Sequence, residues 1–231
     1  MGRKINLENY NKLRKDVSEK YYYTLKLKND LWITLIRELT LNEFKILFVI
    51  LNRFCYQQQK EHFVNTTFDL NFDRQTLNQL LLKNYSITEL CKIIDGISKK
   101  VGIIKLKTED NCKASAKEIA LVCKTIKIEL IEPLKIINSD VNYTILNSFI
   151  ICQVERKLNL IVLFYLRRYK DKKEFFFNEK TLSDEFKIKK HWNRYNLDLR
   201  EELKLYKKAY EIKEIKPVYN GKKIEKILVK K

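Results

Sequence analysis

The sequence predicts an α+β protein made of two consecutive domains, each with a few helices packed against a small antiparallel sheet. The main observation is a repeated order of elements: helix, strand, helix, helix, strand, strand occurs once in residues 1–134 and again in 135–231. The chain of 231 residues, with an apolar fraction of 45%, is also long and apolar enough to bury two cores.

The first three elements follow from a helix cap and from apolar spacing. Thr40 and Glu43 form a capping box ahead of apolar residues at helical spacing, which predicts a buried helix over 41–58. Aromatic and β-branched residues predict a strand within 62–72. A short helix over 74–83 follows.

A second capping box opens the next helix of this domain. Ser86 and Glu89 form it, and Gly102 ends the helical pattern. Two strands are then predicted, over 103–108 and 118–130, with a polar loop between them that projects as a wing.

The second domain shows the same order with clearer turn signals. Asn178 is placed to cap a short helix, and Asn220-Gly221 suits the tight turn of a hairpin. Trp192 and Tyr195 are expected in the core. The predicted elements are a long helix over 147–170, a strand over 174–178, helices over 179–188 and 191–212, and a hairpin over 214–231.

This order is that of a winged helix, so the predicted architecture is two tandem winged-helix domains with hairpin wings. Residues 1–134 form the first domain with an N-terminal extension, and residues 135–231 form the second.

The charge of the chain points to a polyanionic partner. The formal net charge is +18, and residues 187–231 carry 15 Lys+Arg against 6 Asp+Glu. A second cause would also raise the lysine content. Lys, Asn, Ile, Tyr and Phe are all frequent here, as AT-rich coding would produce, and lysines from that cause would simply form a solvated surface.

The candidate DNA-binding residues come from helix-turn-helix geometry. The second helix of such a motif enters the major groove by its N-terminal end, where Arg pairs with guanine, Asn pairs with adenine and Lys contacts phosphates. The lysines of the wing would reach the adjoining backbone. The candidates are Lys187, Lys189, Lys190, His191, Asn193, Arg194, Asn196, Arg200, Lys204, Lys207, Lys208, Lys222 and Lys223.

Several function classes are not supported by the sequence. His62 and His191 are far apart in sequence, and the five cysteines contain no C-x-x-C pair, so no metal site is predicted. The four glycines do not compose a P-loop. We therefore expect no cofactor and no catalytic residues, and a soluble cytoplasmic protein with reduced cysteines and no membrane segment.

The residues also resemble a known family, the iteron-binding initiators of theta-type plasmid replication. "LTLNEFKILFVILNRF" and "ITELCKIIDGISKKVGIIKLK" resemble the first domain of these proteins, and "ERKLNLIVLFYLRRY" and "WNRYNLDLREELKLYKKAYEIKEI" resemble the second. The resemblance covers about residues 30 to 229. Where the family commonly carries more basic residues in the recognition helix, this chain has Asp198, Glu201 and Glu202.

The resemblance implies a function for both domains. The second domain would read directly repeated origin DNA, and the first would contact neighbouring DNA or form a homodimer in equilibrium with the monomer. The protein would help to open an AT-rich segment, recruit host replication proteins (an initiator ATPase and a helicase), and repress its own promoter. Two alternatives stay open: a winged-helix transcription regulator that binds a palindromic operator, and a protein-docking module that does not bind specific DNA.

Overall fold

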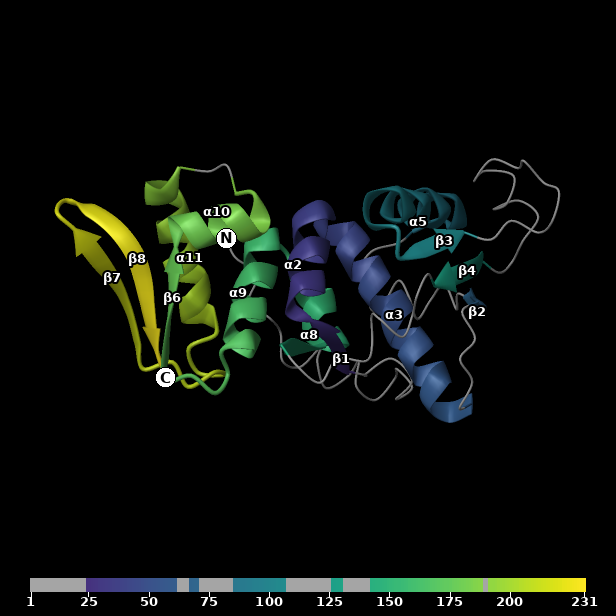
Figure 1. Cartoon of the computed structure of the whole chain (residues 1–231), viewed down its shortest axis with the longest axis horizontal. Helices are drawn as coiled ribbons and strands as arrows, with labels where there is room; N and C mark the ends of the chain where they lie inside the picture. The colour runs from purple at the N-terminus through teal and green to yellow at the C-terminus, as the bar shows by residue number, and fades with distance from the viewer. Residues whose placement is uncertain (1–23, 62–66, 71–84, 107–125, 131–141, 189–190) are drawn as a thin grey trace.

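The computed structural model describes residues 24–61, 67–70, 85–106, 126–130, 142–188 and 191–231 (Figure 1). These residues form helices and small antiparallel sheets along an elongated molecule. In chain order the elements are β1 Thr24–Lys28, α2 Asn29–Glu38, α3 Leu41–Glu61, β2 Thr67–Leu70, α5 Ile87–Val101, β3 Ile104–Leu106, β4 Ile126–Leu130, β5 Tyr143–Asn147, α8 Ser148–Gln153, α9 Lys157–Arg168, β6 Glu174–Asn178, α10 Glu179–Phe186, α11 Trp192–Leu205, β7 Glu214–Asn220 and β8 Lys223–Lys230.

Each half of the chain contains one three-stranded antiparallel sheet, and the two sheets share one topology. The strand order is β2-β4-β3 in the first sheet and β6-β8-β7 in the second, so the last described strand of each half lies between the two earlier ones. The repeated order of elements in the sequence predicts such a shared sheet topology. The helix predicted over 74–83 and the polar loop before β4 lie outside the described residues, so the complete tandem winged-helix arrangement stays a prediction.

Residues of the N-terminal extension connect the two halves, which the sequence did not predict. β1 pairs antiparallel with β5, from Thr24 opposite Asn147 to Lys28 opposite Tyr143. The next element, α2, lies beside α9 and α10 of the second half as well as α3 and α5 of the first. Trp32 is fully buried in α2, and its indole Nε1 donates to the Thr144 carbonyl at 2.8 Å.

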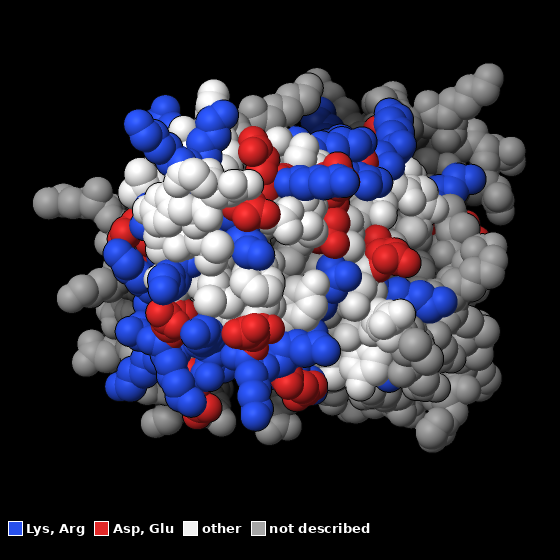
Figure 2. Space-filling view, turned by 60° about the vertical axis from the view of Figure 1, so that its left-hand side comes forward, with Lys and Arg blue, Asp and Glu red and all other residues white. Residues whose placement is uncertain are grey.

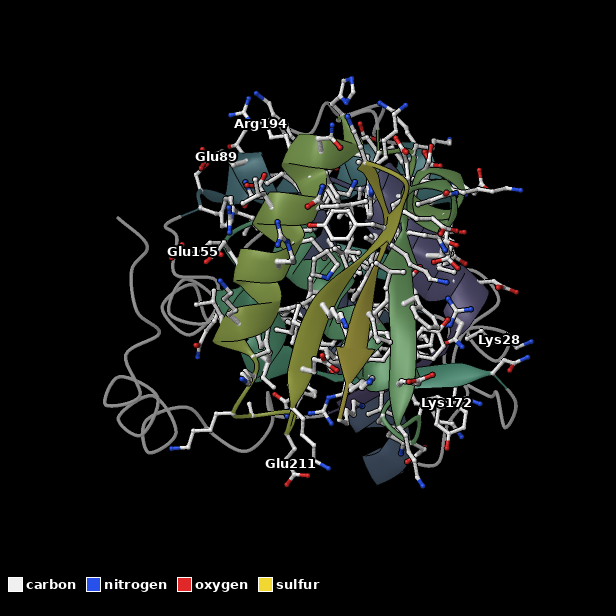
Figure 3. All side chains as sticks on the ribbon, turned by 90° about the vertical axis from the view of Figure 1, so that its left-hand side faces the viewer. Lys28, Glu89, Glu155, Lys172, Arg194 and Glu211 are labelled. Atoms are coloured by element: carbon white, nitrogen blue, oxygen red, sulfur yellow. The ribbon has the colours of Figure 1, made fainter. Side chains whose placement is uncertain are left out.

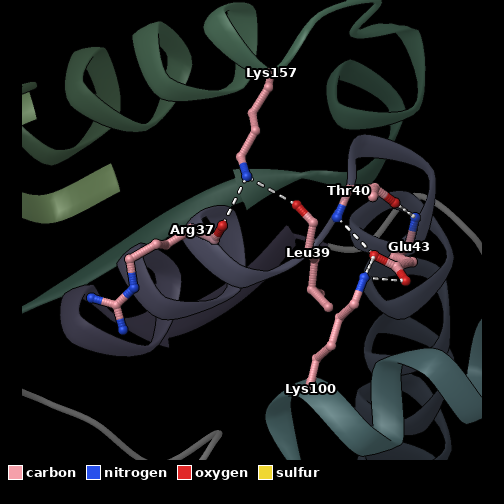
Figure 4. Close-up of polar contacts among 6 residues, drawn as sticks. All are labelled: Arg37, Leu39, Thr40, Glu43, Lys100 and Lys157. Atoms are coloured by element: carbon pink, nitrogen blue, oxygen red, sulfur yellow. Dashed lines mark hydrogen bonds and ion pairs between the residues drawn. The ribbon is translucent and has the colours of Figure 1, made fainter. Parts of the chain in front are cut away.

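Polar contacts fix the turn between α2 and α3 (Figure 4). The predicted capping box is confirmed, because the Thr40 backbone N–H donates to the Glu43 carboxylate and the Glu43 N–H donates to Thr40 Oγ1. Lys100 of α5 pairs with Glu43 at 2.7 Å. Lys157, at the start of α9, donates to the carbonyl oxygens of the last turn and C-cap of α2 at 2.9 and 3.1 Å.

Lys157 therefore satisfies backbone groups that a helix end leaves without partners. Burial lowers the pKa of its ammonium group. This contact connects α2 to α9, and hence the N-terminal extension to the second half of the chain.

The helix predicted over 147–170 is two helices, α8 and α9, with residues 154–156 between them. Apolar periodicity continues through the break, since Val154 is buried, and this is why the sequence indicated one helix. The second helix starts anew because Asn159 acts as a local cap: its Oδ1 accepts from the Arg156 backbone N–H at 2.9 Å.

The helix predicted over 191–212 also ends earlier, at Leu205. Tyr206 forms the C-cap, and the chain turns through Glu211, which has a positive φ of 53°. Beyond the end of α11, Tyr206 and Tyr210 continue the helical spacing of Leu199 and Leu203 and are partly buried against the core. The apolar spacing therefore continues through residues that are not helical.

Candidate nucleic-acid interface

The second half of the chain contains two helices joined by a short basic turn. Asn178 caps α10 as predicted, with its Oδ1 accepting from the Thr181 N–H at 2.7 Å. α10 ends at Phe186, and Lys187 takes a left-handed conformation with φ 52°. His191 is the N-cap of α11. Lys189 and Lys190, predicted to contact DNA, lie outside the described residues.

The buried face of α11 holds the helix against the rest of the domain. Trp192 and Tyr195 are 6% and 5% exposed, which confirms that they are core residues. Leu199 and Leu203 continue the buried stripe at helical spacing. The Trp192 indole Nε1 donates to the Ile224 carbonyl of β8 at 2.6 Å, so the first turn of α11 is tied to the hairpin.

The exposed face of α11 presents polar side chains in the first turn. His191, Asn193 and Arg194 are exposed, and no acidic residue lies in this turn. Figure 3 shows Arg194 at one end of α11, pointing away from the body of the domain. A helix approaching the major groove by its N-terminal end would present these side chains first.

Asn196 was predicted to contact DNA, and this prediction is wrong. The side chain is 1% exposed, and its Nδ2 donates to the carbonyls of Trp192 and Asn193 at 2.9 and 3.0 Å. Asn196 lies four residues after Trp192, on the buried side of the helix. Its amide is therefore used within α11. The guanidinium of partly buried Arg200 also lies near it, with Nη2 3.4 Å from Asn196 Oδ1.

The other basic candidates of this region fall into a separate group. Lys204 pairs with Glu201 at 2.7 Å in the last turns of α11, and Lys207 and Lys208 follow the helix end. A rise of about 1.5 Å per residue puts the end of α11 roughly 16 Å beyond Arg194. A helix that enters DNA by its first turn leaves these three lysines away from the base edges.

The surface charge agrees with this separation. Figure 2 shows Lys and Arg side chains gathered at the top and at the bottom of the face in view, with uncharged, acidic and a few basic residues between them. In Figure 3, the label Arg194 marks the upper end of α11, and the label Glu211, a residue that follows α11, marks the lower end of the domain.

Lys187 of the turn is exposed but not free. Its Nζ lies 3.1 Å from Oε1 of Glu38, the last residue of α2. Hydrogen bonds from Arg37 and then from Lys187 lower the pKa of the Glu38 carboxyl. The pair is solvent-accessible, so it holds Lys187 weakly and leaves it able to exchange Glu38 for a phosphate.

The hairpin predicted over 214–231 is confirmed, since β7 and β8 pair antiparallel. Asn220 lies opposite Lys223, so the turn residues are Gly221 and Lys222, one position later than predicted. Gly221 has a φ of 60°, which glycine adopts without strain. Lys222 and Lys223 are exposed at the tip, and Figure 1 shows the tip at the same end of the molecule as the start of α11.

The three acidic residues of α11 have different environments. Glu201 pairs with Lys204, and Asp198 is partly buried. Glu202 is fully buried: its carboxylate accepts from the Asn159 amide and from Arg156 Nη2, the latter at 2.6 Å. Burial raises the pKa of Glu202 despite the Arg156 guanidinium, which favours the charged form.

The role of Glu202 was missed from the sequence. A signal was present, since Glu202 lies three residues after Leu199 and therefore within the stripe that α11 buries. It joins α11 to the start of α9.

In the described part of the chain, no group of three or more His, Cys, Asp or Glu side chains could hold a metal ion. Over the same residues, no helix has both the length and the apolar character needed to cross a membrane.

The comparisons with known proteins find a likeness in structure. No protein-family model matches the sequence, and no curated protein matches it. Among solved structures, the chain is similar to the crystal structure of Pi initiator protein in complex with iteron DNA, with a TM-score of 0.57 and 14% identity, over 93% of this chain and 99% of that one. The chain thus has the fold of an initiator over nearly its whole length.

Proposed function

We propose that the protein is a plasmid replication initiator that binds directly repeated double-stranded DNA. The proposal depends mainly on one observation: the first turn of α11, with Asn193 and Arg194, and the lysine-bearing tip of the β7–β8 wing lie at the same end of the domain. The bond from Trp192 to the β8 backbone holds helix and wing together. The likeness to an initiator solved with iteron DNA supports the same assignment.

The two parts of this interface have different tasks in the proposal. Arg194 and Asn193 enter the major groove. The guanidinium of Arg194 can donate twice to guanine, and the amide of Asn193 can donate to N7 of adenine and accept from its N6 amino group. Lys222, Lys223 and Lys187 contact phosphates, which positions the helix and supplies salt-dependent affinity without sequence preference. Lys187 leaves Glu38 to do so.

The remaining steps of initiation are proposed from the family resemblance. The protein acts by binding and not by catalysis. Several copies, one bound to each DNA repeat, strain a neighbouring AT-rich segment and bring host replication proteins, an initiator ATPase and a helicase, to it. The chain exchanges between monomer and homodimer and represses its own promoter. It works in the cytoplasm.

The proposal is tested by fluorescence-anisotropy titration of the full chain on duplexes taken from the DNA that flanks its gene. We expect directly repeated sites to bind at least about a thousandfold more tightly than scrambled duplex at physiological salt. Preference for an inverted repeat would indicate a transcription regulator instead. Equal binding to all duplexes, lost at moderate salt, would contradict both assignments.

Two variants and one matched control assign the contacts. Arg194→Ala should cost about 1–3 kcal/mol on the repeat and relax the base preference at one position. Lys208→Ala removes the same charge just beyond the other end of α11 and is the matched control, with a small, uniform effect expected. Changing Lys222 and Lys223 to Ala should weaken every duplex and flatten the salt slope by about one unit per lost phosphate contact. Equal losses for Arg194→Ala and Lys208→Ala would show that only net charge matters.

A further inference from the structure

We propose that Leu197 reads thymine, by packing against the C5-methyl group in the major groove. This inference rests on the proposed function and adds a specificity-determining residue to it. It starts from an exposed leucine in the second turn of α11, 54% exposed, in a helix whose other side is closely packed.

The position of Leu197 relative to the first turn is what makes it informative. Residues of an α-helix are separated by about 100° around the axis, so Leu197 lies roughly 40° from Asn193 and 60° from Arg194, between the two. It stands one turn further along the same face. If Asn193 and Arg194 meet base edges, Leu197 faces the next step of the groove.

The neighbouring side chains leave this position open. Tyr195 is buried on the opposite side of α11, roughly 160° around the axis from Leu197, and Asn196 is buried roughly 100° away. Asp198 is partly buried. Glu201, four residues on, is engaged with Lys204 at 2.7 Å. In the first two turns of α11, Leu197 is thus the apolar residue exposed beside Asn193 and Arg194.

The chemistry of the groove supplies one matching partner. Of the four bases, only thymine presents a methyl group in the major groove, beside its O4 acceptor. A branched aliphatic side chain donates no hydrogen bond, so it gains little from the polar edges of the other bases, but it removes apolar surface from water when it meets the methyl. Leu197 is therefore suited to select thymine while Arg194 and Asn193 select by hydrogen bonds.

The test replaces thymine by uracil, one position at a time, in a repeat from the DNA that flanks the gene. Uracil pairs like thymine and lacks only the methyl group. We expect one or two thymines at which wild-type affinity falls about fourfold, the effect of one buried methyl group. Leu197→Ala should bind the thymine duplex about fourfold or more weakly, and should be indifferent to uracil at those positions.

Leu205→Ala is the matched control. Leu205 is also exposed, at 71%, but it is the last residue of α11, roughly 12 Å further along the axis. This variant should respond to every uracil as the wild type does. Circular dichroism of the three proteins would confirm that the exposed leucines are not needed for folding, and Leu197→Met, which keeps an apolar tip, should retain the response to thymine.

The outcomes separate this inference from the proposed function. If the wild type prefers the repeat but no uracil substitution weakens it, or if Leu197→Ala loses the same further factor at each uracil, the methyl contact is refuted and the initiator assignment stands. If the wild type does not prefer the repeat to scrambled duplex, the proposed function fails and this inference fails with it.

Discussion

The buried carboxylate of Glu202 gives the sharpest prediction for stability. Glu202→Ala removes the acceptor of the Asn159 amide, which is only 9% exposed, and a buried amide without a partner costs about 1–3 kcal/mol. Arg156 is 58% exposed and can rehydrate, so loss of its ion pair adds about 0–1 kcal/mol. We expect a total loss of about 1–4 kcal/mol, a fall in Tm of roughly 2–16 °C.

Glu202→Gln separates the hydrogen bond from the charge. Its Oε1 can still accept from Asn159, while the carboxylate no longer has to be charged in a buried site, so we expect a stability within about 1 kcal/mol of wild type at neutral pH. Glu201→Ala is the matched control one residue earlier. Its side chain is 62% exposed, and its loss should change stability by less than about 0.5 kcal/mol.

The pH dependence has a defined sign. The pKa of Glu202 is raised above its ordinary value of 4.5, first by burial, so the folded state holds this proton more tightly than the unfolded state. The resulting stabilisation is fully present below 4.5 and is lost as pH rises through the folded pKa. Wild type should therefore lose stability relative to Glu202→Gln over that window, and the difference should be constant above it.

Urea denaturation followed by circular dichroism, from pH 4 to 8, measures this difference directly. If the free energy of unfolding of wild type instead rises relative to that of Glu202→Gln as pH rises, the attraction to Arg156 outweighs the effect of burial. A Glu202→Ala loss no larger than that of Glu201→Ala would refute the assignment of Glu202 as a structural link.

Three further predictions concern the other contacts that place the site. Lys157→Met keeps the apolar stem but withdraws both hydrogen bonds from the end of α2, so urea denaturation should show a loss of about 1–3 kcal/mol. Gly221→Ala should cost about 1–2 kcal/mol because of its positive φ alone, since nothing lies within 4 Å of an added Cβ, and Gly221→Asn should cost less. Trp192→Phe removes the hydrogen bond to β8, so it should lower the free energy of unfolding by about 1 kcal/mol and also weaken binding to the repeat. Trp32→Phe breaks a similar bond far from the wing and should affect stability only.

Local signals made much of the fold predictable. The capping boxes at Thr40 and Ser86 and the cap at Asn178 involve residues three apart, so the sequence contains both partners of each bond. The start of α11 was predictable from apolar spacing, because its buried residues recur every three or four positions, as one face of a helix requires. The wing followed from one glycine and its flanking apolar residues.

Contacts between distant segments were not predictable in this way. β1 and β5 are five residues each and more than a hundred residues apart, and neither carries a signal that names its partner. Asn196 shows the same limit within a helix. Its residue type predicts exposure, but its amide is satisfied by two backbone carbonyls of its own helix, so burial costs little.

The acidic residues of α11 show why position decides what a net charge can do. On the sequence, Asp198, Glu201 and Glu202 oppose a DNA-facing role, because each would repel phosphates. In the structure Glu202 is withdrawn from the surface and joined to α9, and Glu201 is neutralised by Lys204 in the later turns. The first two turns are left with Asn193, Arg194 and Leu197 exposed. The carboxylate that seemed to argue against DNA binding therefore holds the helix in the orientation in which its uncharged and basic first turns face outward.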